Sequence, residues 1–439
     1  MGYQYTQHNL WSSIERGLMP FSLHSSQRPT RSSTLTINRT GRRTIGAASL
    51  VIVCVFLFVL KGGPTVAPES SVGFSYFMAT TKVKAPLDEY RDVYNETLGV
   101  RTPIHHVVAD DRKFQKIFLV SLPERTDRRD SFAVQARLSN MSFTVVDGVD
   151  GTTVSNKALP YTMNLIPPQV GCWRAHMNIM QDMVANNIAT ALIFEDDADW
   201  DVGIRAQMRE LAQGSRWLEN STTKSTKSGS PFGEDWDLLW IGHCSTKSGY
   251  DPRRWVVPHD ATVVPPEHRR YHDKPDMRNW ESGPDADNQT RIIFIPTWGV
   301  CTTAYAVSIR GAMKLLYHQS LSKFNMAIDM GIGVMCANPP ATSDFRCIAP
   351  YPAMVGLSRP AGDISKFSDI NTAAFGGVQP SEESHSEGLV FSVHQNIDRL
   401  IAGEAEFKSQ FPDDTGEIMH FDKISAATGH GEIVDTVVN

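Results

Sequence analysis

The stretch that most constrains the fold is residues 189–201, where an apolar run ends abruptly in carboxylates. The run Ala-Leu-Ile-Phe at 191–194 is typical of a buried strand. Four acids follow it closely, namely Glu195, Asp196, Asp197 and Asp199. In open α/β sheets ligands bind at such strand ends, because the chain turns there into loops that carry chemistry. The stretch therefore predicts a sheet protein with a functional site at the end of this strand.

These carboxylates are close enough to repel one another unless a cation lies among them. Oxygen ligands suit hard divalent ions, so the acids predict a Mg²⁺ or Mn²⁺ site that would neutralise a diphosphate. A solvated acidic turn is the alternative, because charge runs usually face water. We favour the metal site, since exposed acidic turns rarely follow a fully apolar strand directly.

The composition excludes some classes of protein. With 42 basic and 48 acidic residues, a net charge of −6 and 9% aromatic residues, neither a nucleic-acid-binding surface nor a wholly disordered chain is expected. A length of 439 residues allows one large domain or two ordinary ones with tails. The six cysteines form no C-x-x-C pair, so no structural zinc site is expected. Cys336 and Cys347 could form a disulfide in an oxidising compartment, but the sequence does not fix the pairing.

The N-terminal quarter of the chain predicts membrane anchoring. Residues 1–43 are basic and rich in Ser and Thr, which indicates a disordered tail, and residues 44–61 are apolar enough for a transmembrane helix. A cleaved signal peptide would follow a much shorter leader. Arginines before the span place the tail in the cytosol and the rest in the lumen, as in a single-pass type II protein of the Golgi or ER. Residues 62–113 read as a stem. Four Asn-x-Ser/Thr sequons follow the span, at Asn95, Asn140, Asn220 and Asn288.

Residues 114–371 alternate strand-like and helical patterns, which predicts an α/β domain with a mostly parallel central sheet. A helix beginning after residues 167–168 carries Cys172 and His176 on its apolar face, where a histidine is more often a core residue than a catalyst. Polar insertions are expected near 215–234 and 243–290, and 372–439 is expected to be a tail without chemistry. The histidines of the second insertion are expected at the surface: His243, His259, His268 and His272.

Several motifs in this region follow the order of one known family. They are 120–129 (Val-Ser-Leu-Pro-Glu-Arg-Thr-Asp-Arg-Arg), Val149-Asp150-Gly151, Gly171-Cys172 with His176, 192–197 (Leu-Ile-Phe-Glu-Asp-Asp), 236–242 (Trp-Asp-Leu-Leu-Trp-Ile-Gly), 304–308 with Gly311-Ala312, Asp329, and Ser368-Asp369-Ile370. The series resembles glycosyltransferase family 25, which includes bacterial lipooligosaccharide galactosyltransferases and procollagen galactosyltransferases. Ala175 departs from the usual serine, and Ile328-Asp329-Met330 lacks a second acid and a nearby proline.

The resemblance implies a GT-A type nucleotide-sugar-binding fold, Mn²⁺ or Mg²⁺, and sugar transfer with inversion at the anomeric carbon. Alternation along a strand puts Glu195 and Asp197 on one side and Asp196 on the other. We therefore expect Asp197 on the metal, Glu195 on the metal or the donor ribose, and Asp196 beside them. Asp199 is a further candidate.

Donor contacts are expected from Arg125, Arg128 and Asp150, since guanidinium groups match phosphate geometry. An ion pair of the arginines with Asp147 or Asp150 is equally compatible with the sequence. An inverting transfer also needs a general base. Asp329 and Asp369 are candidates for it, although either could cap a helix, and His176 is a third catalytic candidate.

Together these observations predict a lumenal hexosyltransferase that uses a nucleotide sugar. UDP-galactose is the expected donor by resemblance, with glucose as the competing sugar, and the acceptor is a glycan or glycoprotein. The alternative is a non-catalytic, membrane-tethered carbohydrate-binding protein that keeps the fold. A Mg²⁺ phosphohydrolase is a third reading that fits the motif order less well. Nucleic acid is not an expected partner.

Overall fold

The apolar run that ends in carboxylates is strand β3 (Thr190–Glu195), inside a nine-stranded sheet. This architecture comes from a computed structural model that describes residues 114–220, 230–249, 251–269, 273–282, 286–337, 344–363, 366–370 and 381–434. The predicted tail, transmembrane helix and stem (residues 1–113) lie outside the described residues. Within the described ranges no helix is long and apolar enough to cross a membrane.

The sheet is mixed, so the prediction of a mostly parallel sheet is wrong. Its order is β16 (His430–Ile433), β7 (Arg253–Val257), β8 (Arg291–Phe294), β11 (Cys347–Tyr351), β5 (Leu238–Gly242), β10 (Ala304–Ser308), β3, β1 (Lys116–Ser121) and β2 (Thr144–Asp147). Among these described strands β1 pairs in parallel with β2 and β3, and β5 with β11, whereas the other five pairings are antiparallel. β10 lies between β3 and β5 and runs antiparallel to both. Its first residue, Ala304, pairs with Phe194 near the end of β3, so the chain enters β10 at the edge where β3 ends.

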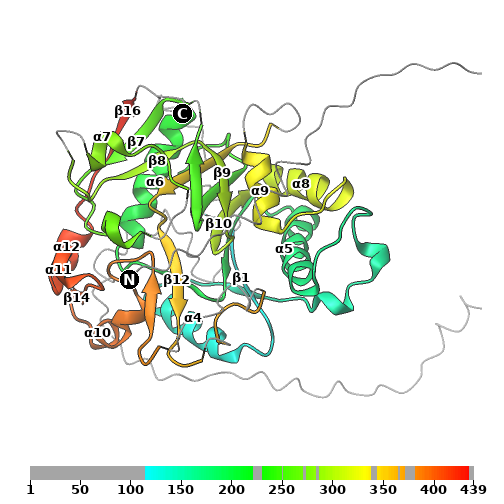
Figure 1. Cartoon of the computed structure of the whole chain (residues 1–439), viewed down its shortest axis with the longest axis horizontal. Helices are drawn as coiled ribbons and strands as arrows, with labels where there is room; N and C mark the ends of the chain where they lie inside the picture. Colours follow the sequence, from blue (N-terminus) through cyan, green and yellow to red (C-terminus); the bar gives the residue numbers. More distant parts are fainter. Residues whose placement is uncertain are drawn as a thin grey trace, which may run out of the picture. The chain divides into compact units, whose positions relative to one another are not determined.

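Side chains along β1 and β3 alternate between two hydrophobic cores, as the two faces of a strand require. Leu119 and Phe194 pack in one core with residues of α4 (Thr126–Leu138) and α6 (Ile204–Leu218). Phe118 and Ile193 pack in the other, with residues of α5 (Pro167–Ala185), α8 (Ile309–Leu316) and α9 (Ile328–Cys336). Figure 1 shows α5, α8 and α9 grouped on one side of the sheet. Helices thus cover both faces of the sheet, so a functional site is expected at the ends of the strands.

Helix α5 begins where the sequence predicts a helix. Pro167 occupies its first turn, where the missing N–H costs no hydrogen bond. The helix ends near Asn187, whose φ of 52° is the left-handed conformation common after a helix. Its buried face includes His176 and Met180.

The polar stretch predicted as an insertion at 243–290 contains secondary structure. It forms β6 (Ser245–Ser248), which pairs with β9 (Pro296–Val300), the sheet strand β7, and the short helix α7 (Arg278–Glu281). Strand β7 was missed because Arg253 and Arg254 mask its apolar residues. Arg254 is buried, its guanidinium donates to the carbonyls of Asp251 and Arg253, and it lies over the ring of Phe294. In the other predicted insertion, near 215–234, the first residues belong to α6 and residues 221–229 lie outside the described ranges.

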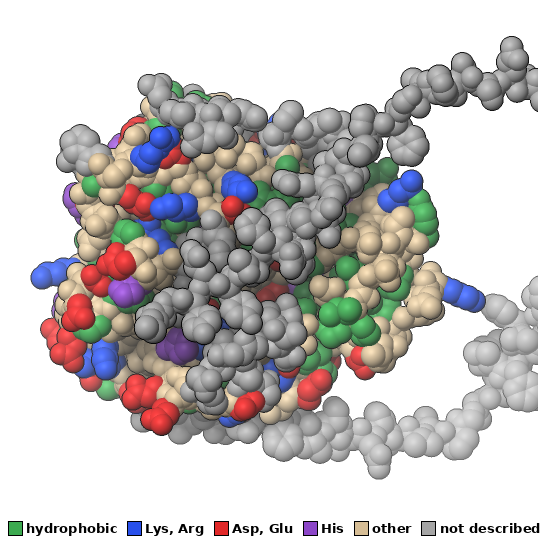
Figure 2. Space-filling view, viewed as in Figure 1, with side chains coloured by type: hydrophobic (Ala, Val, Ile, Leu, Met, Phe, Trp, Pro, Cys, Tyr) green, Lys and Arg blue, Asp and Glu red, His purple; other side chains and the backbone are tan. Residues whose placement is uncertain are grey.

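Residues 381–434, expected to be a tail, are folded against the domain. They contain β13 (His385–Glu387), α10 (Ile397–Ala402), β14 (Glu406–Lys408), α11 (Pro412–Thr415), β15 (Ile418–His420), α12 (Phe421–Ile424) and β16. β13 extends a three-stranded sheet with β12 (Val355–Arg359) and β4 (Ala198–Trp200), and Phe407 and Phe421 are buried. The sequence concealed this because the elements are short and their outer side chains polar. Figure 2 shows acidic side chains gathered over this region at the lower left of the face drawn.

Two disulfides join described residues, Cys244 to Cys301 and Cys336 to Cys347. The second is the pairing that the sequence allowed. Among the described cysteines, Cys172 is left as a free thiol.

Candidate active site

The candidate site lies at the edge where β1, β2, β3 and β5 end together. Register places Val120 beside Glu195 and Ser121 beside Asp147 at this edge. A cavity of about 1060 Å³ opens there. Its lining includes Glu195, Asp197, Asp329, Arg359, Ser368 and His385. The acidic end of β3 therefore faces a cavity large enough for a nucleotide sugar.

Asp197 is the acid whose surroundings are most unusual. Its Oδ1 is buried and has no hydrogen-bond partner among the described residues. Its Oδ2 lies 3.8 Å from Arg128 Nη1 and 3.7 Å from Arg359 Nη1. Burial raises the pKa of Asp197 to about 6, since the two guanidinium groups offset only part of the desolvation. Its backbone carbonyl accepts a hydrogen bond of 2.7 Å from the Ser358 N–H, which fixes the loop after β3.

Glu195 is held by polar neighbours on its own side of the cavity. Its Oε1 accepts a 2.6 Å hydrogen bond from the Thr302 hydroxyl and lies 3.5 Å from His176 Nε2. Burial would raise the pKa of Glu195, but the contacts with His176 and Thr302 hold it below the ordinary value. Glu195 is therefore an ionised carboxylate at neutral pH.

His176 lies behind Glu195 and does not line the cavity. It is fully buried, with Nδ1 2.9 Å from the Tyr305 hydroxyl and its ring stacked on that of Tyr305. Its Nε2 makes no hydrogen bond of ordinary geometry among the described residues. The contact with Glu195 makes His176 a positioning residue for that carboxylate.

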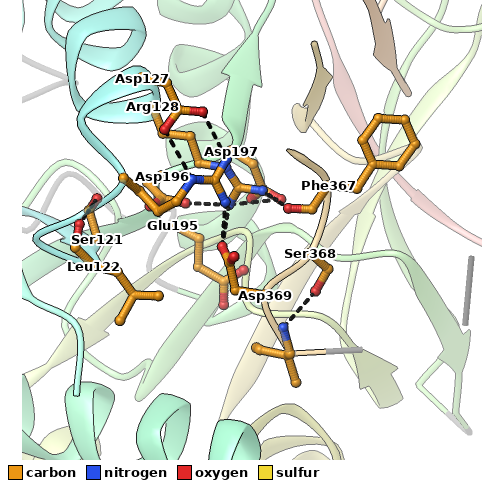
Figure 3. Close-up of polar contacts among 12 residues, drawn as sticks. Ser121, Leu122, Asp127, Arg128, Glu195, Asp196, Asp197, Phe367, Ser368 and Asp369 are labelled. Atoms are coloured by element: carbon orange, nitrogen blue, oxygen red, sulfur yellow. Dashed lines mark hydrogen bonds and ion pairs between the residues drawn. The ribbon is translucent and has the colours of Figure 1, made fainter. Parts of the chain in front are cut away.

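Two arginines of the 120–129 motif bind the segment formed by residues 366–370. Arg128 donates 2.6 Å to Asp196 and also donates to the carbonyls of Lys366 and Phe367. Arg125 donates to the carboxylate of Asp369 and to the Lys366 carbonyl. Figure 3 shows Arg128 between the acids after β3 and the 366–370 segment. The structure thus brings together three motifs that are far apart in the sequence.

Arg125 and Arg128 form neither of the ion pairs with Asp147 or Asp150 that the sequence allowed, and their contact with a donor stays a prediction. Arg125 pairs with Asp127 and Asp369, and Arg128 pairs with Asp196. The arginine that pairs with Asp147 is their neighbour Arg129. Burial raises the pKa of Asp196, and Asp196 points to Arg128 and is not part of the cavity wall.

The two candidate bases lie in different environments. Asp329, in the first turn of α9, lines the cavity and accepts hydrogen bonds from the Cys301 and Met330 N–H groups at 2.9 and 2.8 Å. Burial raises its pKa. Asp369 is 37% exposed and its carboxylate is engaged by Arg125. A base needs an accessible lone pair and a raised pKa, so the geometry favours Asp329.

Two of the acids singled out in the sequence lie elsewhere. Asp150 caps a short 3₁₀ helix (Gly151–Thr153), accepts from the Thr152 N–H and hydroxyl, and does not line the cavity. Asp199 is fully buried and accepts hydrogen bonds from the hydroxyls of Ser386 and Ser392. Both therefore have structural tasks in this arrangement.

His243 and Arg359 are among the cavity residues that the sequence reasoning missed. His243, expected at the surface, is buried, donates 2.7 Å from Nε2 to the Pro350 carbonyl and lines the cavity. Burial lowers its pKa to about 4, so it is neutral at physiological pH. Its position directly after the apolar strand β5 was a usable signal, because the acids follow β3 in the same way. Arg359 ends β12, and only a lone arginine before Pro360 marked it in the sequence.

The donor set fits a hard divalent cation. An orphaned buried carboxylate oxygen on Asp197 and the ionised Glu195 supply oxygen ligands of the kind that Mn²⁺ and Mg²⁺ prefer. Desolvation of the Asp197 carboxylate costs free energy, and a bound cation would offset that cost.

Comparison with known proteins agrees with the motifs. Residues 114–227 match the model of glycosyltransferase family 25 (LPS biosynthesis protein). The inactive glycosyltransferase 25 family member 3 of Homo sapiens is 24% identical over 283 residues, which cover 60% of this chain and 40% of that protein. Procollagen galactosyltransferase 1-A of Xenopus laevis is 23% identical over 288 residues, covering 61% of this chain and 39% of that protein. Procollagen galactosyltransferase 1 of Danio rerio is 23% identical over 287 residues, covering 60% and 40%.

The chain thus spans well under half the length of these curated relatives. The family model covers β1, α4, β2, α5, β3, β4 and α6, and so includes the arginine motif and the acids after β3. The chain is therefore similar to glycosyltransferase family 25 in this region, as the motifs in its sequence predict.

Proposed function

We propose that this chain is a metal-assisted hexosyltransferase that moves galactose from UDP-galactose to a glycan or glycoprotein acceptor. The observation that carries the proposal is Asp197, whose Oδ1 has no partner among the described residues in the wall of a nucleotide-sugar-sized cavity. Relatives named procollagen galactosyltransferases support the choice of sugar, with glucose as the competing donor sugar.

Cleaving a nucleotide sugar places negative charge on the departing diphosphate, and the site is built to receive it. Asp197 and Glu195 would hold Mn²⁺ or Mg²⁺, which would stabilise that charge electrostatically. Arg359 and Arg128 lie within 4 Å of Asp197 and add fixed positive charge beside it. A guanidinium that now faces Asp197 could also donate to a phosphate oxygen.

The acceptor hydroxyl must lose its proton as its oxygen attacks the anomeric carbon. In the proposed reaction this proton passes to Asp329, the bond from the anomeric carbon to the diphosphate oxygen breaks, and the configuration inverts. Asp329 suits this task because burial raises its pKa, which makes its carboxylate a stronger base. Its two backbone N–H donors fix its orientation.

The proposed location is the lumen of the ER or Golgi, with one N-terminal helix in the membrane. The names of the procollagen galactosyltransferase relatives are consistent with a secretory compartment. The two disulfides are also typical of an oxidising compartment.

The test is a panel of nucleotide sugars incubated with the purified full chain and Mn²⁺, with release of the nucleotide diphosphate as the readout. UDP-galactose is expected to be hydrolysed or transferred, and Asp197→Asn is expected to lose about a hundredfold or more of this activity. Asp398→Asn, at an exposed acid of α10, is the matched control. Metal-dependent turnover that is equal in the Asp197 variant and the control would remove the metal site from the proposal.

A second candidate function is a carbohydrate-binding protein without turnover. It is favoured by one observation, the similarity to a relative named inactive glycosyltransferase 25 family member 3. Binding of a nucleotide sugar without release of the diphosphate, across the whole panel, would support this candidate over the enzyme.

A further inference from the structure

Beside the cavity lies a cluster of three side chains that could bind a metal and that the proposed transfer does not explain. Cys172 and His176 lie one turn apart on α5, and Glu195 ends the neighbouring β3. One ligand atom from each, a sulfur, a ring nitrogen and a carboxylate oxygen, lies within 4.8 Å of the other two. Cys172 and Glu195 line the cavity, so a cation can reach the cluster from there.

His176 supplies an independent sign of a missing ligand. The ring is fully buried, yet its Nε2 makes no hydrogen bond among the described residues and lies 3.5 Å from Glu195 Oε1. Its Nδ1 is 2.9 Å from the Tyr305 hydroxyl. With an ion bound, Nδ1–H would donate to that oxygen, and the Nε2 lone pair would give up the contact with Glu195 and bind the ion.

The chemistry of the three groups selects a softer ion than the proposed donor site does. We propose that Cys172, His176 and Glu195 form a Zn²⁺ site with an open fourth position facing the cavity. Thiolate and imidazole favour Zn²⁺ over Mn²⁺, and three protein ligands with one open position are typical of accessible zinc sites. This site differs from the structural zinc sites that C-x-x-C pairs would have indicated.

The distances allow this with small side-chain rotations. Zinc holds sulfur at about 2.3 Å and nitrogen or oxygen at about 2.0 to 2.2 Å, so the ligand atoms of a tetrahedral site lie roughly 3.3 to 3.8 Å apart. Burial raises the pKa of the free Cys172 thiol. Coordination therefore releases its proton to solvent as the sulfur–zinc bond forms.

Zinc binding has a consequence for the neighbouring site, because Glu195 would belong to both. Occupancy by Zn²⁺ withdraws Glu195 from the donor and adds a cation beside the cavity. We expect Zn²⁺ to inhibit the Mn²⁺-dependent reaction. The binding itself does not depend on that reaction.

The experiment uses Co²⁺ as a coloured substitute for Zn²⁺ on the chelator-stripped full chain. The wild-type protein is expected to gain a thiolate-to-cobalt charge-transfer band in the near ultraviolet, which Zn²⁺ abolishes by displacement. Cys172→Ser is expected to lack the band. Cys54→Ser, which removes a thiol outside the described residues, is the matched control and is expected to keep it.

Two further variants separate this site from alternatives. His176→Gln, checked for folding by circular dichroism, is expected to weaken Co²⁺ binding by about tenfold or more, since loss of even an outer partner of a metal ligand costs 10- to 100-fold. His268→Ala disrupts a second cluster of potential ligands, the exposed group Glu267, His268 and Asp414, and is expected to leave the band unchanged because that cluster has no thiol.

A wild-type protein without the band, a band that survives in Cys172→Ser, or unchanged affinity in His176→Gln would overturn the zinc site. Failure of the proposed transferase would look different. In that case Mn²⁺-dependent turnover would be absent from every variant while the cobalt band and its loss in Cys172→Ser would remain.

Discussion

At the scale of single residues, Asp197 combines its proposed role as a metal ligand with a cost in stability.

 Its carboxylate is buried beside two arginines, and burial raises its pKa to about 6. A group whose pKa is higher in the folded state stabilises the fold at low pH, and this stabilisation is lost as the pH rises through the folded pKa. The wild-type protein is therefore expected to carry an unfavourable charge at Asp197 above about pH 6.

Asp197→Asn removes this charge, so its effect on stability depends on pH. A shift of roughly two pKa units corresponds to about 3 kcal/mol, and the variant is expected to gain up to that much in free energy of unfolding near pH 7.5 and little near pH 4. Urea denaturation at the two pH values measures the difference, with Asp398→Asn as the control. A variant less stable than the wild-type protein near pH 7.5 would contradict this account.

Asp199 shows the opposite case, a buried carboxylate with its partners in place. Ser392→Ala removes one of its hydroxyl donors and is expected to cost about 1 to 3 kcal/mol in free energy of unfolding, because a buried acceptor then loses a hydrogen bond. Ser384→Ala is the matched control, since that hydroxyl only accepts a 3.3 Å bond from Gln395. Equal stability of the two variants would show that Ser386 alone satisfies Oδ2 of Asp199.

A sequence contains the order of residues and their local patterns, and this limits how much of the site could be predicted from it. Glu195, Asp197 and Asp329 were identified because they follow apolar segments, and all three line the cavity. Asp150 did not join them, because a motif match gives no direction for a side chain. His243 was misjudged because its polar neighbours suggested a loop, whereas its burial is set by the strands around it.

At the scale of elements, the 366–370 segment is held to α4 by arginine side chains. Arg125→Met removes the donors to Asp369 and to the Lys366 carbonyl. Amide hydrogen exchange in 366–370 is expected to become roughly tenfold faster, because charge-assisted bonds that restrain the segment are lost. Arg129, in the first turn of the helix that Arg125 precedes, binds Ser121 and Asp147 instead. Amide exchange in 366–370 of the Arg129→Met variant should therefore match that of the wild-type protein. Identical exchange in both variants would mean that other contacts restrain the segment.

The elements also show where sequence patterns lose information. β1, β3 and α5 were predicted because each has a long apolar pattern of one period. The direction of β10 was not, since an apolar strand reads the same in either direction and its neighbours in space decide its course. β13, β14 and β15 have three residues each, too few for a period to appear.

At the scale of the whole molecule, the sequons allow a test of the prediction that the residues after the membrane span lie in the lumen. Asn220 and Asn288 are exposed, and Asn220 has a φ of 57° just after α6, where asparagine also serves to end a helix. Removal of the sequon should therefore leave that asparagine in place.

Thr222→Ala does so, since it destroys the sequon without changing Asn220. We expect the full chain from eukaryotic cells to lose mass on treatment with an N-glycosidase, and the Thr222 variant to lose less. A chain with no glycosidase-sensitive mass at any sequon would contradict the lumenal location.

The disulfide between Cys244 and Cys301 lies in the wall of the cavity. Both cysteines line the cavity, and the Cys301 N–H, from a residue with a left-handed φ of 68°, donates to Asp329. A reductant is therefore expected to lower turnover in the wild-type protein and in the Cys336→Ser/Cys347→Ser variant alike, measured by release of the nucleotide diphosphate. Turnover that tolerates complete reduction would separate the disulfide from the site.

The same link implies an order of maturation. The Cys301 N–H would hold the proposed base, Asp329, in place only after Cys244 and Cys301, 57 positions apart in the sequence, have formed their disulfide. A newly made chain still in a reducing compartment would then be inert, and competence would arise only where its proposed acceptors are found.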